Sequence, residues 1–138
     1  MPTSKIRFSS AYESLSQVEK MVEEVCDENH ISEDNYGNIL VAVTEAVNNA
    51  IQHGNKFDPT KEIEVEYEKR NLELVFRITD QGLGFDYTSI PDPTDPQNLE
   101  KINGRGVFLM RNLADKVNFL ENGRIVELCF IPAPDIAG

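Results

Sequence analysis

One stretch of the chain, TEAVNNAIQHGNK at residues 44–56, carries a carboxylate and several amides in a pattern typical of a helix. At 3.6 residues per turn, Glu45 and Asn49 lie one turn apart on the same helix face. Asn48 and Gln52 lie beside them. An amide oxygen can ligate a hard ion such as Mg²⁺, and a carboxylate one turn away can orient or deprotonate a nucleophile. The spacing therefore predicts a helix face that can do chemistry.

A face that simply meets solvent is the alternative, and two features of the sequence weigh against it. Although 27% of the chain is charged, Glu45 is the only charged residue between Ile39 and Gln52. Asparagine is a poor residue for a helix interior, yet Asn48 and Asn49 stand together in mid-helix, where Lys or Glu would serve better.

A first glycine segment, Asp80-Gln-Gly82-Leu-Gly84, follows a predicted strand. Glycines two residues apart allow backbone conformations and close approaches that side chains forbid. Asp80, held at a strand end, is a fixed acceptor for a ligand donor such as an exocyclic amine. Taken alone, the same segment can also be only a turn.

A second glycine segment, Asn103-Gly104-Arg105-Gly106, precedes a short helix predicted over residues 107–113. Bare backbone N–H groups and the positive end of the helix dipole favour an anion at such a loop, and Arg105 adds a mobile positive charge. It is not a Walker loop, because the Gly-Lys-Ser/Thr ending is absent.

The elements that must position these residues follow from periodicity and from turn and cap signals. A capping box at Ser10–Glu13 opens a first helix to about Glu28, and Ser32 caps the second helix. The predicted strands are residues 5–10, 62–70 and 72–80, with a final hairpin over 116–131 that turns at Asn122-Gly123. Residues 86–103 are either a lid or a disordered segment. This order predicts an α+β sandwich, with helices on one face of a mixed, mainly antiparallel sheet.

Composition limits the ligands and the surroundings. The 138 residues predict one domain, 1–138, and neither a membrane-spanning run nor an apolar signal segment is recognised, so the cytoplasm is expected. A formal charge of −11 disfavours direct binding to nucleic acid or to anionic membranes. An anionic ligand would therefore need a metal ion, a helix N-terminus or a placed Arg. Cys26 and Cys129 lack metal-ligand spacing and are interpreted as buried thiols rather than as ligands or a disulfide.

In this order, the three segments resemble the nucleotide-binding boxes of the GHKL (histidine-kinase-like) ATPase superfamily. The resemblance rests on Glu45-x-x-x-Asn49, Asp80-x-Gly82-x-Gly84 and Gly104-x-Gly106. That superfamily includes gyrase, mismatch-repair ATPases and sensor histidine kinases. Three sequence segments are most similar to the bacterial anti-sigma-factor serine/threonine kinases: EAVNNAIQHGN, DQGLGFD and GRGVFLMRNLAD.

The resemblance implies a Bergerat-type two-layer fold with an ATP and Mg²⁺ site. Asn49 would ligate Mg²⁺, and Glu45 would be the general base or the water-orienting residue. Asp80 would accept a hydrogen bond from the adenine amine. The remaining expected binding residues are Gly82 and Gly84 at the base, and Gly104, Arg105 and Gly106 at the phosphates under a lid of residues 87–103. His53 follows the helix motif, and either a role behind the site or a surface role suits it.

The function implied first is a protein serine/threonine kinase and anti-sigma factor of a partner-switching module. It would bind a sigma factor in one state and phosphorylate an anti-sigma-factor antagonist in another, and the family suggests a homodimer. The second hypothesis is an ATP-binding module that sequesters a partner without kinase activity. Glu45 favours the kinase, because a pure switch needs no base. A stand-alone ATPase is disfavoured, because nothing couples hydrolysis to motion. Sensor histidine kinases phosphorylate a His on a separate pair of helices. We expect that this chain has no room for such a pair, so the residue that accepts the phosphoryl group would lie on another protein.

Overall fold

Strand β2, Glu62–Arg70, shows how the sheet acquires two different faces. Ile63, Val65 and Tyr67 are buried, and the glutamates between them point to the opposite face, as the twofold alternation of a strand requires. The computed structural model describes residues 3–82 and 102–132, so Gly84 and residues 87–101 of the expected lid lie outside the described residues.

The sheet has the strand order β1-β2-β3-β5-β4. The other strands are β1 (Thr3–Ser9), β3 (Glu73–Thr79), β4 (Lys116–Leu120) and β5 (Ile125–Phe130). Each strand pair that the structure describes is antiparallel. The predicted α+β class is confirmed, but within the described residues the sheet is antiparallel rather than mixed.

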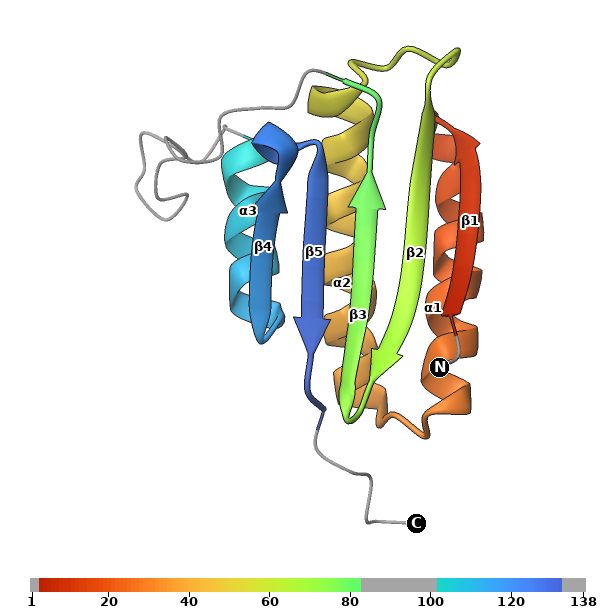
Figure 1. Ribbon diagram of the computed structural model, residues 1–138, viewed down its shortest axis with the longest axis vertical. Coiled ribbons are helices and arrows are strands. Elements are labelled where there is room, and N and C mark those ends of the chain that lie inside the picture. Colours follow the sequence, from red (N-terminus) through yellow and green to blue (C-terminus); the bar gives the residue numbers. More distant parts are fainter. Residues whose placement is uncertain (1–2, 83–101, 133–138) are drawn as a thin grey trace.

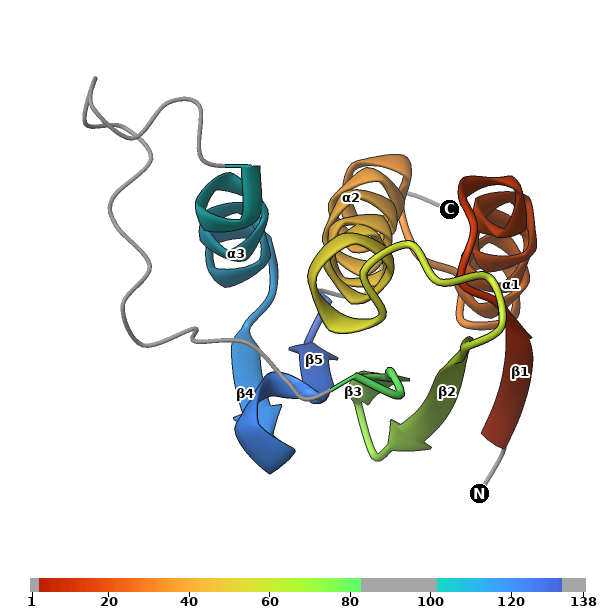
Figure 2. The same cartoon turned by 90° about the horizontal axis from the view of Figure 1, so that it is seen from above.

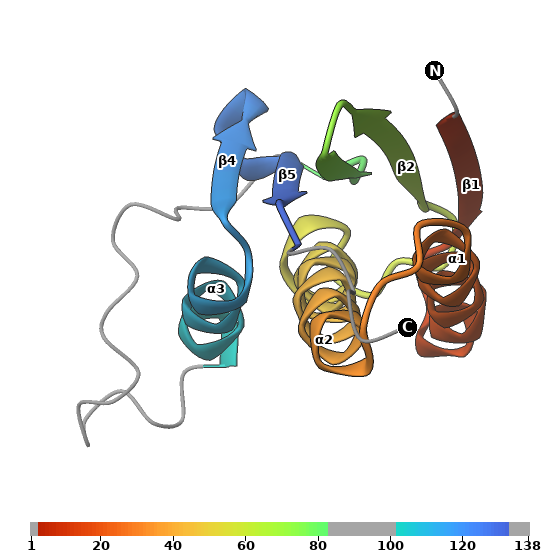
Figure 3. The same ribbon diagram turned by 90° about the horizontal axis from the view of Figure 1, so that it is seen from below.

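The helices α1 (Leu15–Glu28), α2 (Glu33–Asn49) and α3 (Ile102–Leu113) cover one face of this sheet (Figure 1). Views from the two ends show α2 between α1 and α3, with the sheet as a separate layer (Figures 2 and 3). The predicted two-layer arrangement is therefore confirmed. No helix among the described residues is long and apolar enough to cross a membrane.

The core lies between the sheet and the central helix. The apolar face of α2 predicted from helical spacing is buried, with Ile39, Val43 and Val47 at most 1% exposed. Phe76 of β3 lies under this layer and contacts the rings of Tyr67 and Phe130, at centroid distances of 5.3 and 6.1 Å. Because α2 packs through its apolar side, the face that bears Glu45 is left for other contacts.

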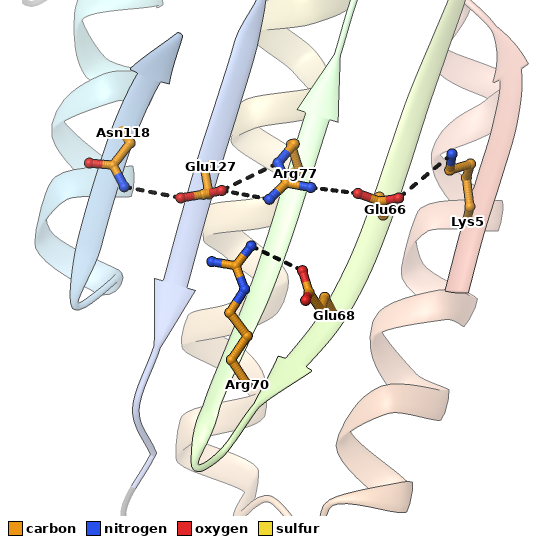
Figure 4. Close-up of polar contacts among 7 residues, drawn as sticks. All are labelled: Lys5, Glu66, Glu68, Arg70, Arg77, Asn118 and Glu127. Atoms are coloured by element: carbon orange, nitrogen blue, oxygen red, sulfur yellow. Dashed lines mark hydrogen bonds and ion pairs between the residues drawn. The ribbon is translucent and has the colours of Figure 1, made fainter. Parts of the chain in front are cut away.

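The open face of the sheet, opposite the helices, carries a row of alternating charges (Figure 4). The row consists of cross-strand partners from all five strands: Lys5, Glu66, Arg77, Glu127 and Asn118. Arg77 Nη2 lies 2.7 Å from Glu127 Oε2, Asn118 donates to Glu127 over 3.1 Å, and Lys5 Nζ lies 3.6 Å from Glu66 Oε2. We call this set the charge row.

Of the two predicted helix caps, one is confirmed and the other is wrong. Ser32 caps α2 as predicted, since its hydroxyl accepts from Asn35 N–H at 3.3 Å. The predicted capping box at Ser10 is wrong, because a 3₁₀ turn at Tyr12–Ser14 precedes α1. The backbone N–H of Ser10 donates to Lys61 O at 3.0 Å, which still ties this residue to the β2 side, and no described residue bonds its buried hydroxyl.

The final hairpin exists, but its connection is longer than the predicted two-residue turn. Leu120 pairs with Ile125, and a 3₁₀ turn at Glu121–Gly123 joins the strands. Glu121 and Gly123 have left-handed φ angles of 52° and 88°. The glycine tolerates this conformation. The position of the turn was therefore predicted correctly, but the two-residue turn type was wrong.

Candidate functional site

The polar stripe of α2 lies at the helix C-terminal end. Glu45 is half-buried and Asn49, the last α-helical residue, is 2% exposed. The chain then continues as a π-helical turn, η2, at Ala50–Gly54. Such turns are rare and are often found at functional sites. The predicted placement of both residues one turn apart on one helix is confirmed.

Three buried polar atoms of this segment have no hydrogen-bond partner among the described residues: Asn48 Oδ1, Asn49 Nδ2 and His53 Nε2. Leaving a buried polar group unsatisfied costs about 1–3 kcal/mol, so native proteins seldom do so. Burial lowers the pKa of His53 below its usual range, which favours a neutral imidazole. Each of these three atoms is therefore a candidate for a polar contact outside the described residues.

Asp80 follows the end of β3 and is 4% exposed. Its backbone N–H donates to Arg124 O at 3.0 Å, and its Oδ1 accepts from Gly82 N–H at 2.7 Å. Burial raises the pKa of Asp80, and this effect outweighs the opposing hydrogen bond from Gly82 and the positive charges of Arg124 and Lys61. The structure thus places a buried acceptor at the strand end, as predicted.

Two glycines allow the end of α2 to approach this strand end. A Cβ on Gly82 would lie 1.8 Å from Gly54 O, and a Cβ on Gly54 would lie 2.2 Å from Asp80 Oδ2. Neither distance is compatible with a side chain. The predicted close approach at Gly82 is confirmed, and its neighbour is η2. Gly54 was missed by the sequence reasoning, because a glycine after a helix is ordinarily interpreted as a helix end.

Asn55 was also missed, and it connects the same two segments. This residue is 1% exposed. Its Oδ1 accepts from Gln81 N–H at 2.8 Å, and its Nδ2 donates to Glu62 O at 3.1 Å. Gln81 Oε1 in turn accepts from Glu62 N–H at 2.7 Å. We call these three bonds the Asn55 clamp. The only sequence signal was a short amide after His-Gly, which many loops share.

The third predicted segment lies inside a helix rather than before one. α3 begins at Ile102, so Gly104, Arg105 and Gly106 occupy its first turns, and the predicted start near residue 107 is wrong. Two helical glycines each cost about 1 kcal/mol relative to Ala, and the packing of α3 against α2, with Met110 fully buried, offsets this cost. The first backbone N–H groups of a helix have no helical partner, so this end still suits an anion.

No group of three His, Cys, Asp or Glu side chains within residues 3–82 and 102–132 is arranged to hold an ion. Mg²⁺ is commonly bound through one or two protein oxygens together with substrate phosphates. Cys26 and Cys129 are buried free thiols, as predicted, and burial raises the pKa of each to about 11.

The sequence is similar to proteins named serine-protein kinase RsbW. It is 32% identical over 85 residues to RsbW of Listeria innocua serovar 6a, covering 57% of this chain and 54% of that protein. It is 33% identical over 92 residues to RsbW of Bacillus licheniformis, covering 62% of this chain and 58% of that protein. The chain thus matches somewhat more than half the length of these relatives.

A solved structure, that of the RsbU and RsbW domains of Rv1364c from Mycobacterium tuberculosis, shares the fold. The match has a TM-score of 0.63 and covers 99% of this chain and 35% of that chain, with 15% identical residues. The profile of the histidine kinase-like ATPase domain family matches residues 8–130. With its fold, its helix motif and this match, the chain belongs to the histidine kinase-like ATPase domain family.

Proposed function

We propose that the protein is an ATP-dependent protein serine/threonine kinase and anti-sigma factor of a partner-switching module. The observation that carries the proposal is the carboxylate of Glu45 one helical turn before the buried amide of Asn49, on a helix whose end contacts Asp80. The similarity to proteins named serine-protein kinases supports the same chemistry.

The residues fit Mg²⁺ and ATP. Asn49 would hold the ion through its side-chain amide oxygen, since hard cations take oxygen ligands. The amide nitrogen, which cannot ligate a cation, is buried and has no hydrogen-bond partner among the described residues. Asp80 would take the adenine amine, Gly82 and Gly84 would shape the base pocket, and the N-terminal end of α3 at Gly104–Gly106, with Arg105, would face the phosphates. When bound, Mg²⁺·ATP supplies the phosphoryl group.

The chain's own contribution is positioning and proton transfer. Glu45 would take the proton from the attacking hydroxyl of a Ser or Thr. The hydroxyl oxygen would bond to the γ-phosphorus of ATP while the bond from that phosphorus to the β,γ-bridging oxygen breaks and ADP leaves. Asp80 would fix the base end of the nucleotide through a hydrogen bond. Because Asp80 is only 4% exposed, this bond would be shielded from water. Positioning and charge stabilisation account for most catalysis of phosphoryl transfer.

The proposed partners are a sigma factor and an anti-sigma-factor antagonist that carries the acceptor hydroxyl. The formal charge of −11 suits a basic protein surface and disfavours nucleic acid. A homodimer and a cytoplasmic location belong to the same proposal.

Transfer of labelled phosphate from ATP to a Ser or Thr of a purified antagonist-type protein, encoded beside this chain, tests the kinase. Transfer that requires both proteins and Mg²⁺ is expected. Binding of ATP and of the partner without any transfer would support the second hypothesis, a module that sequesters its partner. Failure to bind ATP would remove both.

A further inference from the structure

We propose that Asn55 is a positioning residue for base recognition, because its bond to Gln81 N–H sets the direction of the Asp80 carboxylate. This inference rests on the proposed function, in which Asp80 accepts the exocyclic amine of adenine. It adds Asn55, which is not one of the residues that define the three motif spacings, although it is the last residue of the segment EAVNNAIQHGN, and which would act through Asp80.

The first step is the connection of Asn55 to the helix. Its backbone N–H donates to Ala50 O at 2.7 Å, which fixes the residue at the end of η2. Phe57 N–H donates to Ile51 O, also at 2.7 Å. Asn55 therefore moves with the segment that carries Asn49 and Gly54, not with a free loop.

The second step is the connection of Asn55 to the strand end. Gln81 directly follows Asp80, and its N–H donates to Asn55 Oδ1 at 2.8 Å. The other two bonds of the Asn55 clamp hold the start of β2 against the same point. Because Asn55 is only 1% exposed, the two bonds of its side chain are shielded from water, whereas the bond between Glu62 and Gln81 is exposed.

The third step is the narrow space around the carboxylate. Asp80 Oδ1 accepts from Gly82 N–H at 2.7 Å, and Asp80 Oδ2 lies 2.2 Å from the position that a Cβ on Gly54 would take. The carboxylate is thus held between the glycine of η2 and the backbone that the clamp fixes. Without the bond from Gln81, the peptide after Asp80 can rotate, and the carboxylate loses its defined direction.

The test compares ATP with inosine triphosphate, which has a carbonyl oxygen in place of the exocyclic amine. The ratio of the two dissociation constants, measured by calorimetry with Mg²⁺, reports the contact with Asp80. A hydrogen bond to a buried carboxylate predicts a preference for ATP of about 10-fold or more in the wild type. Asn55→Ala is expected to lower this ratio by about 5- to 10-fold, because the amine then meets a misdirected acceptor.

Asn29→Ala is the matched control. The Asn29 amide also makes two bonds, to Val25 O at 2.8 Å and to Tyr67 Oη at 3.1 Å, but it lies at the opposite end of the molecule, where α1 ends (Figure 1). Its loss should lower the melting temperature and leave the ATP preference unchanged. If only the Asn55 variant loses the preference for ATP, the effect comes from the positioning of Asp80 and not from a general loss of stability.

Asn55→Ser, which retains a hydrogen-bonding group as a hydroxyl on Cβ, is the milder variant should Asn55→Ala not fold. A loss of about 3-fold in the ratio is expected for it. An unchanged ratio in a folded Asn55 variant, checked by circular dichroism, overturns the proposal. A wild type that binds ATP and inosine triphosphate equally overturns the role of Asp80 and this inference with it. An error in the role of Asp80 would thus be seen in the wild type, which would show no preference for ATP. An error in the role of Asn55 alone would be seen only in the Asn55 variants, which would keep the wild-type preference.

Discussion

At the scale of single residues, the site separates into two roles on one helix. Glu45 is half-buried and can exchange a proton, whereas Asn49 is 2% exposed and neutral at every pH. In the proposed mechanism the carboxylate would act on the attacking hydroxyl and the amide on the metal ion, so the two residues can be altered independently of each other.

Glu45→Gln should leave Mg²⁺·ATP binding nearly intact and lower the rate of phosphoryl transfer by about 10²–10⁴-fold, the usual contribution of a positioned general base. Glutamine keeps the size and the polarity of the side chain but cannot take the proton. Binding is measured by calorimetry and transfer by labelled phosphate on the antagonist. Glu24→Gln, on an exposed position of α1, is the control and should transfer at the wild-type rate. Wild-type transfer by Glu45→Gln would place the base elsewhere.

At the scale of elements, the two glycines on the continuous segment of α2 and η2 stand in opposite surroundings. Gly37 lies inside α2 with no atom within 4 Å of an added Cβ. A Cβ added to Gly54 would lie 2.2 Å from Asp80 Oδ2. The same substitution should therefore have opposite effects on the free energy of unfolding.

Gly37→Ala should stabilise the protein by about 0.5–1 kcal/mol, because alanine loses less backbone entropy in a helix. Gly54→Ala should destabilise it by about 1–3 kcal/mol, because the added methyl group forces η2 away from the end of β3. Urea unfolding of both variants and the wild type measures the difference. A neutral Gly54→Ala would mean that the segments separate without strain.

The charge row makes the stability of the sheet depend on pH. Burial by itself raises the pKa of Glu127, but the hydrogen bonds from Arg77 and Asn118 and the charges of Arg77 and Arg70 outweigh it, and the net pKa is lowered. A lowered pKa in the folded state stabilises the protein above the pKa of an unfolded glutamate, about 4.3, and this stability is lost as the pH falls through the folded value.

Arg77→Met should therefore destabilise the protein by about 1–3 kcal/mol near neutral pH, where Glu66 and Glu127 lose their shared partner. The difference from the wild type should shrink as the pH falls below about 4.3, because protonated Glu127 no longer needs the cation. Urea unfolding of the variant and the wild type at several pH values measures this difference in the free energy of unfolding. Lys5→Met is the control, since Lys5 is 55% exposed and its ion pairs should contribute less than about 1 kcal/mol. A difference that does not vary with pH would contradict the role of Glu127.

At the scale of the whole molecule, the formal charge of −11 opposes every anionic ligand. The protein can offset this repulsion only locally, at the N-terminal end of α3 and through a bound cation. The structure brings the end of α2 and the end of β3 to the same end of the molecule (Figure 1).

ATP binding should accordingly weaken on the order of 10-fold or more when Mg²⁺ is removed, because only the N-terminal end of α3 and Arg105 would then offset the charge of the triphosphate. Calorimetric titrations with Mg²⁺ and with a chelator measure this dependence. Asn49→Ala should bind ATP in the chelator as the wild type does and gain little when Mg²⁺ is added. Equal affinity of the wild type under both conditions would contradict a metal held at Asn49.

The sequence alone determined those features that depend on neighbours within one element. Helical spacing placed Glu45 and Asn49 on one face, Ser32 marked the start of α2, and alternation assigned the buried side chains of β2. These predictions succeeded because caps, helix faces and strand faces are set by residues a few positions apart. The α+β class followed from the order of such elements.

Tertiary structure alone decided the contacts between distant segments. The α3 helix begins at Ile102 because its packing against α2 offsets the cost of its glycines, and Ser10 is no cap because its backbone pairs with Lys61. Gly54 and Asn55 became recognisable as site residues only when η2 lay against Asp80 and Gln81. Periodicity carries no information about such contacts, because they depend on how separate elements pack, and packing is a property of the whole chain.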